Sequence, residues 1–256
     1  MALPLSKIDP ASIGSSRYAL FLDFDGTIVE LAEQPNLVQV GARTLATLSH
    51  LDQVFDGAIA IVTGRTIDTV DAFLTPLRLP IAGIHGRERR DAKGVVRSAS
   101  HEITVIAELR KRLQPLLVKW PGLLMEDKGS ALALHYRSHP EYEKSCLAMM
   151  ERAVADLAGV QLLRGKMVIE AVAGSADKAS AVSAFLAEPP FWGRHPIYAG
   201  DDLTDESALR LVNSLAGISI KVGANESAAH YSAASVNELI TWLKAVAASA
   251  TVVGGE

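Results

Sequence analysis

The sequence predicts an α/β fold in which a parallel sheet, covered by helices, is interrupted by an inserted αββαββ unit. Apolar runs and helical patterns alternate through about the first hundred residues and return towards the end of the chain, as expected for an α/β sheet. The run Tyr18–Leu22 is too apolar for a half-exposed strand and is typical of a central parallel strand covered on both faces. Between the two halves the order changes to helix, strand, strand, and this order occurs twice.

Short strands separated by helices make up each half of the predicted sheet domain. In the first half we predict strands at 18–22, 57–62 and 79–84 and helices at 42–50 and 66–74. In the second half we predict helices at 178–186, 205–213 and 236–246 and strands at 196–199 and 216–222. Ligands of such sheets bind beyond the carboxyl ends of the strands, so the residues that follow the strands are the first candidates for a site.

The insert has a different pattern, with strands that occur in pairs. We predict helices at 103–117 and 140–157 and strands at 123–127, 131–136, 160–163 and 167–171. Short turns that contain glycine, at 128–130 and 164–166, indicate two hairpins. We therefore expect a catalytic core formed by 1–102 and 174–256 and a separate cap domain at 103–173, with small, polar hinges at 98–102 and 173–176.

Composition narrows the classes of partner. The net charge of -4 and the isoelectric point near 6 give no reason to propose a nucleic acid or an anionic membrane as partner. The single cysteine, Cys146, excludes an internal disulfide framework and fits a reducing compartment. Neither a signal peptide nor a run long enough to span a bilayer is recognisable. We expect a cytoplasmic monomer that acts on a small molecule.

Two carboxylates directly follow the first predicted strand, in the order Asp23, Phe24, Asp25, Gly26, Thr27. Asp23 could attack phosphorus as a carboxylate nucleophile. Asp25 could protonate the leaving alkoxide and then activate water as a general base. The alternative is an ordinary turn, because aspartate and glycine favour turns. A calcium loop is excluded, since the glycine stands at the fourth loop position instead of the sixth. The motif favours phosphoryl transfer.

Two further segments could complete a phosphate site. Thr63, Gly64 and Arg65 follow the second predicted strand, where a hydroxyl and backbone amides ahead of a helix can hold an anion. Thr63 could equally be a helix N-cap. Lys178 opens the first helix after the insert, and its ammonium group could offset negative charge in a transition state. A solvated surface pair with Asp177 is the alternative for this lysine.

Four acids within six residues, 201–206, follow the strand at 196–199. Such acids repel one another unless a cation neutralises them, and oxygen ligands with room for water suit Mg²⁺. We expect Asp23, the backbone carbonyl of Asp25 and Asp201 to hold Mg²⁺, with Asp202 orienting a water or the lysine from the second shell of ligands. Asp205 and Glu206 could serve only as acids at a helix N-terminus.

The four motifs, in this order and each at a strand end or helix start, resemble those of the haloacid dehalogenase superfamily of aspartate-nucleophile phosphatases. The resemblance implies a Rossmann-like core of that type, with Asp23, Asp25, Thr63 and Lys178 as catalytic residues. Segments 81–91, 126–129, 133–137, 165–170 and 200–206 further resemble the trehalose-6-phosphate phosphatase family, and the likeness spans 18–243. It implies Mg²⁺-dependent hydrolysis of trehalose 6-phosphate through an aspartyl-phosphate.

The family resemblance also assigns residues of the insert. Glu126, Lys128 and Glu170 match cap residues that contact the glucose unit remote from the phosphate, although charges beside hairpin turns are commonly only solvated. Further candidates for substrate binding are Gly64, Arg65, His85, Arg137 and Lys166. Arg137 could instead form a structural ion pair, and His85 could bond only to backbone groups. The chain departs from the family pattern at Ala171–Ala173 and at Ala179.

Three other functions remain open on the sequence. The chain could hydrolyse another sugar phosphate, such as that of sucrose, mannosyl-glycerate or glucosyl-glycerate, or it could be a sugar-phosphate sensor without catalysis. The complete set of acids and the lysine argues against a sensor, because a binding protein has no use for a proton-transferring Asp25. A phosphomutase is less favoured, since its product must turn around within the cap. A functional coupling to the synthase that makes trehalose 6-phosphate is a further expectation.

Overall fold

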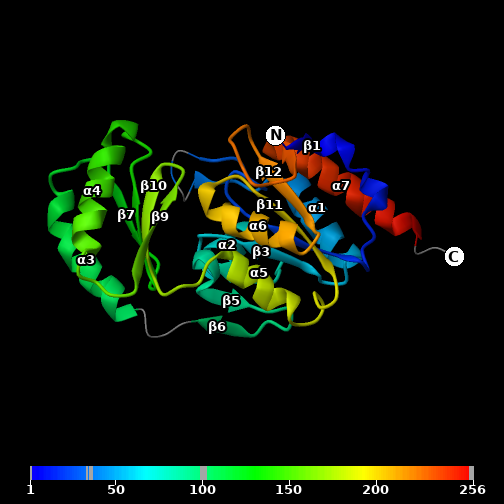
Figure 1. The fold of residues 1–256 in the computed structure, drawn as a ribbon, viewed down its shortest axis with the longest axis horizontal. Helices are drawn as coiled ribbons and strands as arrows, with labels where there is room; N and C mark the ends of the chain where they lie inside the picture. The colour runs from blue at the N-terminus through cyan, green and yellow to red at the C-terminus, as the bar shows by residue number, and fades with distance from the viewer. Residues whose placement is uncertain (1, 33, 35–36, 99–102, 254–256) are drawn as a thin grey trace. The chain divides into compact units, whose positions relative to one another are not determined.

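The computed structural model describes residues 2–32, 34, 37–98 and 103–253, and these fall into two compact units (Figure 1). The first unit comprises Met1–Arg97 and Asp177–Glu256, and the second comprises Ser98–Ala176. The predicted insert at 103–173 lies within the second unit. Of the predicted hinge at 98–102, residues 99–102 lie outside the described part of the chain. No helix in the described ranges is long and apolar enough to cross a membrane.

The first unit is built on a nine-stranded sheet with the strand order β1-β13-β12-β11-β2-β3-β4-β5-β6. The neighbours from β1 to β4 pair in parallel, whereas β5 is antiparallel to β4. The strands are β1 Leu3–Pro4, β2 Tyr18–Leu22, β3 Ile59–Val62, β4 Ile81–Gly83, β5 Glu88–Arg90, β6 Val96–Ser98, β11 His195–Gly200, β12 Ile218–Val222 and β13 Tyr231–Ala233. The predicted parallel sheet is present, and two short strands at each of its ends, which the pattern did not indicate, extend it.

Helices of the first unit cover both faces of this sheet (Figure 1). They are α1 Ala42–Val54, α2 Ile67–Leu74, α5 Lys178–Leu186, α6 Glu206–Ser214 and α7 Val236–Val253. Phe21 of β2 packs against Phe185 of α5 and against Phe191, with ring centroids 6.1 Å and 5.4 Å apart. Because successive side chains of a strand point to opposite faces, Leu20 and Leu22 are directed to the other layer. The side chains of β2 thus pack against the helices on both faces of the sheet.

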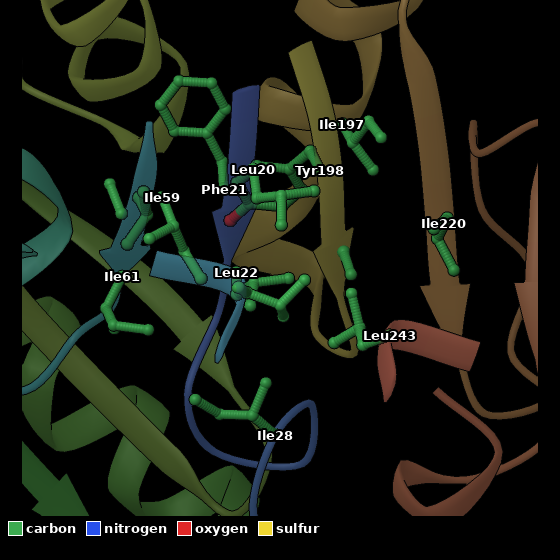
Figure 2. Close-up of a cluster of buried hydrophobic side chains, with 14 of the residues drawn as sticks. Leu20, Phe21, Leu22, Ile28, Ile59, Ile61, Ile197, Tyr198, Ile220 and Leu243 are labelled. Atoms are coloured by element: carbon green, nitrogen blue, oxygen red, sulfur yellow. The ribbon is translucent and has the colours of Figure 1, made fainter. Parts of the chain in front are cut away.

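The core lies directly beneath the carboxyl ends of the central strands. Figure 2 shows buried side chains of β2, β3, β11 and β12 together with Leu243 of α7. Leu22 is paired with Ile61 of β3 on one side and with Ala199 of β11 on the other. The residues that follow these three parallel strands therefore meet at one edge of the sheet. This register brings Asp23, Thr63 and Asp201 to the same edge.

The second unit is a four-stranded antiparallel sheet with the order β7-β8-β10-β9, packed against two helices. The elements are α3 Ile103–Leu117, β7 Leu124–Asp127, β8 Ala131–His135, the short 3₁₀ helix η6 Pro140–Tyr142, α4 Glu143–Val154, β9 Val160–Gly165 and β10 Val168–Ala173. Both predicted hairpins are present. The helix predicted at 140–157 is divided into η6 and α4, and it ends at Val154.

Alternation along the strands gives this second sheet two different faces. Leu132 and Leu134 of β8 belong to the core formed with α3 and α4, and Cys146 is fully buried in the same core. Ala131, Ala133 and His135 point to the opposite face, because side chains alternate along a strand. The helices therefore cover only one face, and the polar residues of the hairpins are collected on the other.

Candidate active site

Asp23 is buried at the end of β2 and accepts two hydrogen bonds through its carboxylate. Its Oδ1 accepts from Nζ of Lys178 at 2.7 Å, and its Oδ2 accepts from Oγ1 of Thr27 at 3.0 Å. The backbone N–H of Asp23 donates to the carbonyl of Ala199 at 2.9 Å, which continues the pairing with β11. The sheet thus holds the carboxylate in position beside an ammonium group. The hydroxyl of Thr27 helps to orient the carboxylate of Asp23.

Two glycines allow the acidic residues to approach this edge. A Cβ atom added to Gly26 would lie 2.1 Å from Oδ2 of Asp201, and the φ angle of Gly26 is +74°. A Cβ atom added to Gly200 would lie 2.3 Å from Cγ of Asp205. Only glycine lacks the atom that would clash, so both positions are explained by close packing of carboxylates.

Three carboxylates lie close together at this edge, and two of them contact the ammonium group of Lys178. Carboxylate oxygens of Asp23, Asp201 and Asp205 all lie within 4.8 Å of one another. Nζ of Lys178 donates to Oδ1 of Asp23 and, at 2.6 Å, to Oδ1 of Asp205. Lys178 is only 3% exposed, so it is no surface partner of Asp177, whose side chain caps α5 by accepting from the backbone N–H of Ser180. The one ammonium group thus pairs with two of the three acids.

The second acid that contacts Lys178, beside Asp23, is Asp205. For Asp205 the sequence indicated only a possible role at a helix start. Asp205 is completely buried and also accepts hydrogen bonds from the hydroxyl of Tyr198 at 2.6 Å and from the backbone N–H of Asp202 at 2.9 Å. Asp202, which we expected beside the lysine or a bound water, accepts from the backbone N–H of Leu203 as a helix cap. The orienting contact on Lys178 therefore comes from a position three residues later.

The charges of this cluster shift the pKa values of its members. Burial raises the pKa of Asp23 well above its ordinary value, and the carboxylates of Asp205 and Asp201 add to the increase, while Lys178 opposes it. Burial by itself would lower the pKa of Lys178, but the carboxylates of Asp205 and Asp23 raise it above its ordinary value. The lysine is therefore protonated, and the site carries an excess of negative groups that a cation would relieve.

Asp25 is held by a two-point contact with Arg65. Nε of Arg65 donates to Oδ2 of Asp25 at 2.6 Å, and Nη2 donates to Oδ1 at 2.7 Å. The guanidinium lies over the rings of Phe24 and Phe73, with centroids 5.7 Å and 5.1 Å from Cζ. Arg65, a predicted substrate contact, is thus also a partner of the predicted acid and base. A bidentate contact of this kind fixes the direction of a carboxylate.

The loop after β3 is tied to the loop after β4. Oγ1 of Thr63 accepts from the backbone N–H of Arg65 at 3.1 Å, while the backbone N–H of His85 donates to the carbonyl of Thr63 at 2.9 Å. His85 is buried and has a left-handed backbone with φ of 54°. The N-cap of α2 is Thr66 and not Thr63. Glu88, which the sequence did not single out, accepts from the first helical amide, Ile67, at 2.6 Å.

A second lysine, Lys221, was not indicated by any motif. It lies near the end of β12, is buried, and donates from Nζ to the backbone carbonyl of Asp201 at 2.6 Å. The contact supports the loop that carries Asp201. A charged residue within an otherwise buried parallel strand was the available signal, because such strands are normally apolar throughout.

The second unit contains its own polar cluster, on the face of the sheet that the helices do not cover. Nζ of Lys128 donates to Oε1 of Glu170 in a short contact and lies 3.9 Å from Oε2 of Glu126. Nε2 of His135 lies 2.8 Å from the same Oε2 of Glu126. Burial alone would raise the pKa of Glu126, but the hydrogen bond with His135 and the charge of Lys128 hold it below its ordinary value.

The remaining two candidates of this unit are Lys166 and Arg137. Lys166 is exposed in the turn between β9 and β10. Arg137 is half-buried just after β8. The two acids and the lysine selected from the hairpins are therefore brought together, because antiparallel pairing places Glu126 opposite Ala133 and Ala133 opposite Glu170. The roles of all these residues remain predictions.

Comparison with known proteins identifies the family. The family model described as trehalose-phosphatase matches residues 21–240. The chain belongs to the trehalose-phosphatase family. It is 45% identical over 226 residues to a probable trehalose-phosphate phosphatase of Sinorhizobium fredii, covering 87% of this chain and 84% of that protein. It is 37% identical over 232 residues to the trehalose-6-phosphate phosphatase of Escherichia coli, covering 91% and 87%.

Solved structures of this family and of a wider superfamily share the fold. The C-terminal domain of the trehalose-6-phosphate phosphatase of C. albicans has a TM-score of 0.85 at 19% identity, covering 97% of this chain and 98% of that one. A phosphatase of the haloalkanoate (HAD) superfamily from Bacteroides thetaiotaomicron has a TM-score of 0.56 at 18% identity, covering 90% and 94%. The predicted fold class and the family resemblance are both confirmed.

Proposed function

We propose that this chain hydrolyses trehalose 6-phosphate to trehalose and phosphate through an aspartyl-phosphate formed on Asp23. The observation that carries the proposal is the buried carboxylate of Asp23 at a parallel sheet edge, bonded to Lys178 and followed two residues later by Asp25. The names of the relatives in Sinorhizobium fredii and Escherichia coli support the substrate.

The reaction divides into two displacements at phosphorus. A carboxylate oxygen of Asp23 attacks the phosphorus atom, the bond to the sugar oxygen breaks, and Asp25 gives its proton to that leaving oxygen. Asp25 then takes a proton from a water molecule whose oxygen attacks the same phosphorus, which releases phosphate and restores Asp23. Lys178 offsets the negative charge on the transferring group throughout. Arg65 holds both oxygens of Asp25, so we propose that it sets the direction of this proton carrier.

The acids of the site suit a divalent cation. The carboxylates of Asp23, Asp201 and Asp205 lie close together, whereas the ammonium group of Lys178 donates to only two of them. Burial raises the pKa of Asp23, and the charges of Asp205 and Asp201 raise it further. We propose that Asp23, Asp201 and the carbonyl of Asp25 hold Mg²⁺, as the sequence indicated, while Asp205 orients Lys178. When bound, Mg²⁺ neutralises charge on the phosphoryl oxygens and on the attacking carboxylate.

We propose that the second unit is the cap that selects the sugar. Glu126, Lys128 and Glu170 form one polar cluster on the open face of its sheet, and charged groups of this kind bind sugar hydroxyls. Binding energy gained on the glucose unit remote from the phosphate would align the reacting atoms. Cytoplasmic location, a monomeric state and coupling to a synthase remain predictions from the sequence.

The test is phosphate release from trehalose 6-phosphate and from a panel of other sugar phosphates, with and without Mg²⁺. We expect a clear preference for trehalose 6-phosphate and dependence on Mg²⁺. The variant Asp23→Asn should lose turnover and keep its fold, as judged by circular dichroism. A flat, weak substrate profile would contradict the substrate, and appreciable activity of Asp23→Asn would contradict the nucleophile.

A further inference from the structure

A groove between the two helices of the second unit lies apart from the polar cluster described above. Its volume is about 560 Å³, and residues of both α3 and α4 line it. The floor is apolar and includes Leu116, Trp120, Ala148 and Met149. These helices cover one face of the sheet and the polar cluster occupies the other, so the groove is a separate feature. Pockets of this size commonly hold small organic ligands.

Three cations stand at the edge of this apolar floor. Lys119, Lys144 and Arg152 are exposed and line the groove, and none of them forms an ion pair with an acid within 2–32, 34, 37–98 or 103–253. A fourth cation, Arg112, differs, because its guanidinium is already bonded to Asp156 and to the carbonyl of Ala153. The net charge of the whole chain is -4, so this local excess of positive charge does not follow from composition.

The position of Lys144 makes a purely structural role unfavourable. Lys144 is the second residue of α4, which begins at Glu143. A cation in the first turn opposes the helix dipole, whereas a cation in the last turn, such as Arg152, is favoured. The helix would therefore be more stable without the charge of Lys144.

We propose that the groove binds a small amphipathic organic anion. Its ring system or short apolar chain would lie against Trp120 and Met149, and its phosphate, sulfonate or carboxylate group would meet Lys144 with Lys119 or Arg152. The indole N–H of Trp120 has no hydrogen-bond partner within the described ranges and offers a further donor. The proposal concerns a second ligand site on this chain and does not depend on the proposed reaction.

The probe for this site is 1-anilinonaphthalene-8-sulfonate, with neutral N-phenyl-1-naphthylamine as its counterpart that lacks only the sulfonate. Fluorescence titration of the whole chain should show saturable binding of one sulfonate probe per chain. The neutral compound should bind about tenfold more weakly, the loss expected when one charge-assisted contact is absent. Raising the salt concentration should weaken only the sulfonate probe, because exposed charges are screened.

Variants separate a binding role from a structural one. Lys144→Glu should weaken the sulfonate probe by about tenfold and leave the melting temperature unchanged or higher, because an acid in the first turn favours the helix dipole. Lys111→Glu, which changes the charge equally at an exposed position of α3 outside the groove, should leave binding unchanged. Ala148→Phe should abolish binding of both probes by filling the groove.

Displacement experiments exclude the proposed catalytic site as the source of the signal. The experiment uses the variant Asp23→Asn, because this variant cannot consume trehalose 6-phosphate if the proposed function is right. Excess trehalose 6-phosphate should not displace the sulfonate probe from it. Absence of saturable binding would overturn the proposal. Displacement of the sulfonate probe by trehalose 6-phosphate, or equal affinity for both probes, would also overturn the proposal. The same holds if neither Lys144→Glu nor Ala148→Phe weakens the binding of the sulfonate probe. None of these results depends on turnover, so the failure of either proposal is visible separately.

Discussion

The contact between Gly26 and Asp201 leads to a quantitative prediction for Gly26→Ala. The new Cβ atom would lie 2.1 Å from Oδ2 of Asp201, although real Cβ contacts essentially never fall below 3.0 Å. Asp201 must therefore move by about 1 Å, a displacement that can cost about 100-fold in rate when it affects a reacting group. The left-handed φ of +74° adds about 1 kcal/mol of backbone strain for alanine.

Gly94→Ala is a matched control for the backbone term. Gly94 has a φ of +82°, and nothing lies within 4 Å of an added Cβ atom. Both variants should therefore lose about 1 kcal/mol of stability, which corresponds to a fall in melting temperature of about 2–4 °C for a domain of this size. Only Gly26→Ala should also lose turnover and affinity for Mg²⁺.

The assays are calorimetric melting, phosphate release, and titration of the apoprotein with Mg²⁺ by isothermal calorimetry. The calorimetric titration reports on the metal ligands without relying on turnover. If Gly26→Ala keeps near-normal activity and affinity for Mg²⁺, the close packing of Asp201 is not required by the site. If Gly94→Ala is equally inactive, backbone strain and not the clash explains the loss.

Three further predictions concern the acids of both units. Asp205→Asn should lower kcat by about 100-fold, because Lys178 loses a charged partner and the backbone N–H of Asp202 can face an amide donor. Asp202→Asn should have a smaller effect. Equal losses of activity for the two variants in phosphate-release assays would refute the distinction. Lys128→Gln should raise KM for trehalose 6-phosphate by about tenfold and spare 4-nitrophenyl phosphate, and equal losses on both substrates would count against sugar recognition. Because the pKa of Glu126 is lower in the folded chain, its stabilising contribution is present above the ordinary glutamate pKa and is lost as the pH falls through the lowered value. Glu126→Gln should thus reduce the loss of stability on acidification, measured by melting between neutral and acidic pH; Glu151→Gln, an exposed control, should behave as the unchanged chain.

Local patterns were sufficient for the elements that pass through the core. The bounds of β2, α3 and α5 agree with the prediction at both ends, because each is a distinct run of apolar or helix-forming residues in the sequence. The strands at the two ends of the sheet, β1, β13, β5 and β6, contain only two or three residues and carry too little periodicity to be recognised. β1 pairs with β13 from the other end of the chain, a contact that no local pattern expresses.

The motif residues of the candidate site were predictable from the sequence, but their contacts were not. The sequence by itself determined which residue types stand at the strand ends and at the start of α5, and these types indicated phosphoryl chemistry. Short motifs place Asp23, Thr63 and Asp201 after neighbouring parallel strands and Lys178 at a helix start. Only the tertiary structure decided which side chains touch. Hydrogen bonds join residues far apart in the chain, such as Arg65 to Asp25 and Lys221 to the carbonyl of Asp201, and depend on strand register and on the direction of each side chain.

Asp205 shows the physical reason for this division. In the sequence, Asp205 and Asp202 are equally typical of acids at a helix start, and both take part in capping. The turn after β11 buries Asp205 completely and directs it to Lys178, while Asp202 caps the turn, and the bare Cα of Gly200 leaves the space for this packing. Composition and spacing determine which charges are available at the sheet edge, and three-dimensional packing decides which of them form a pair.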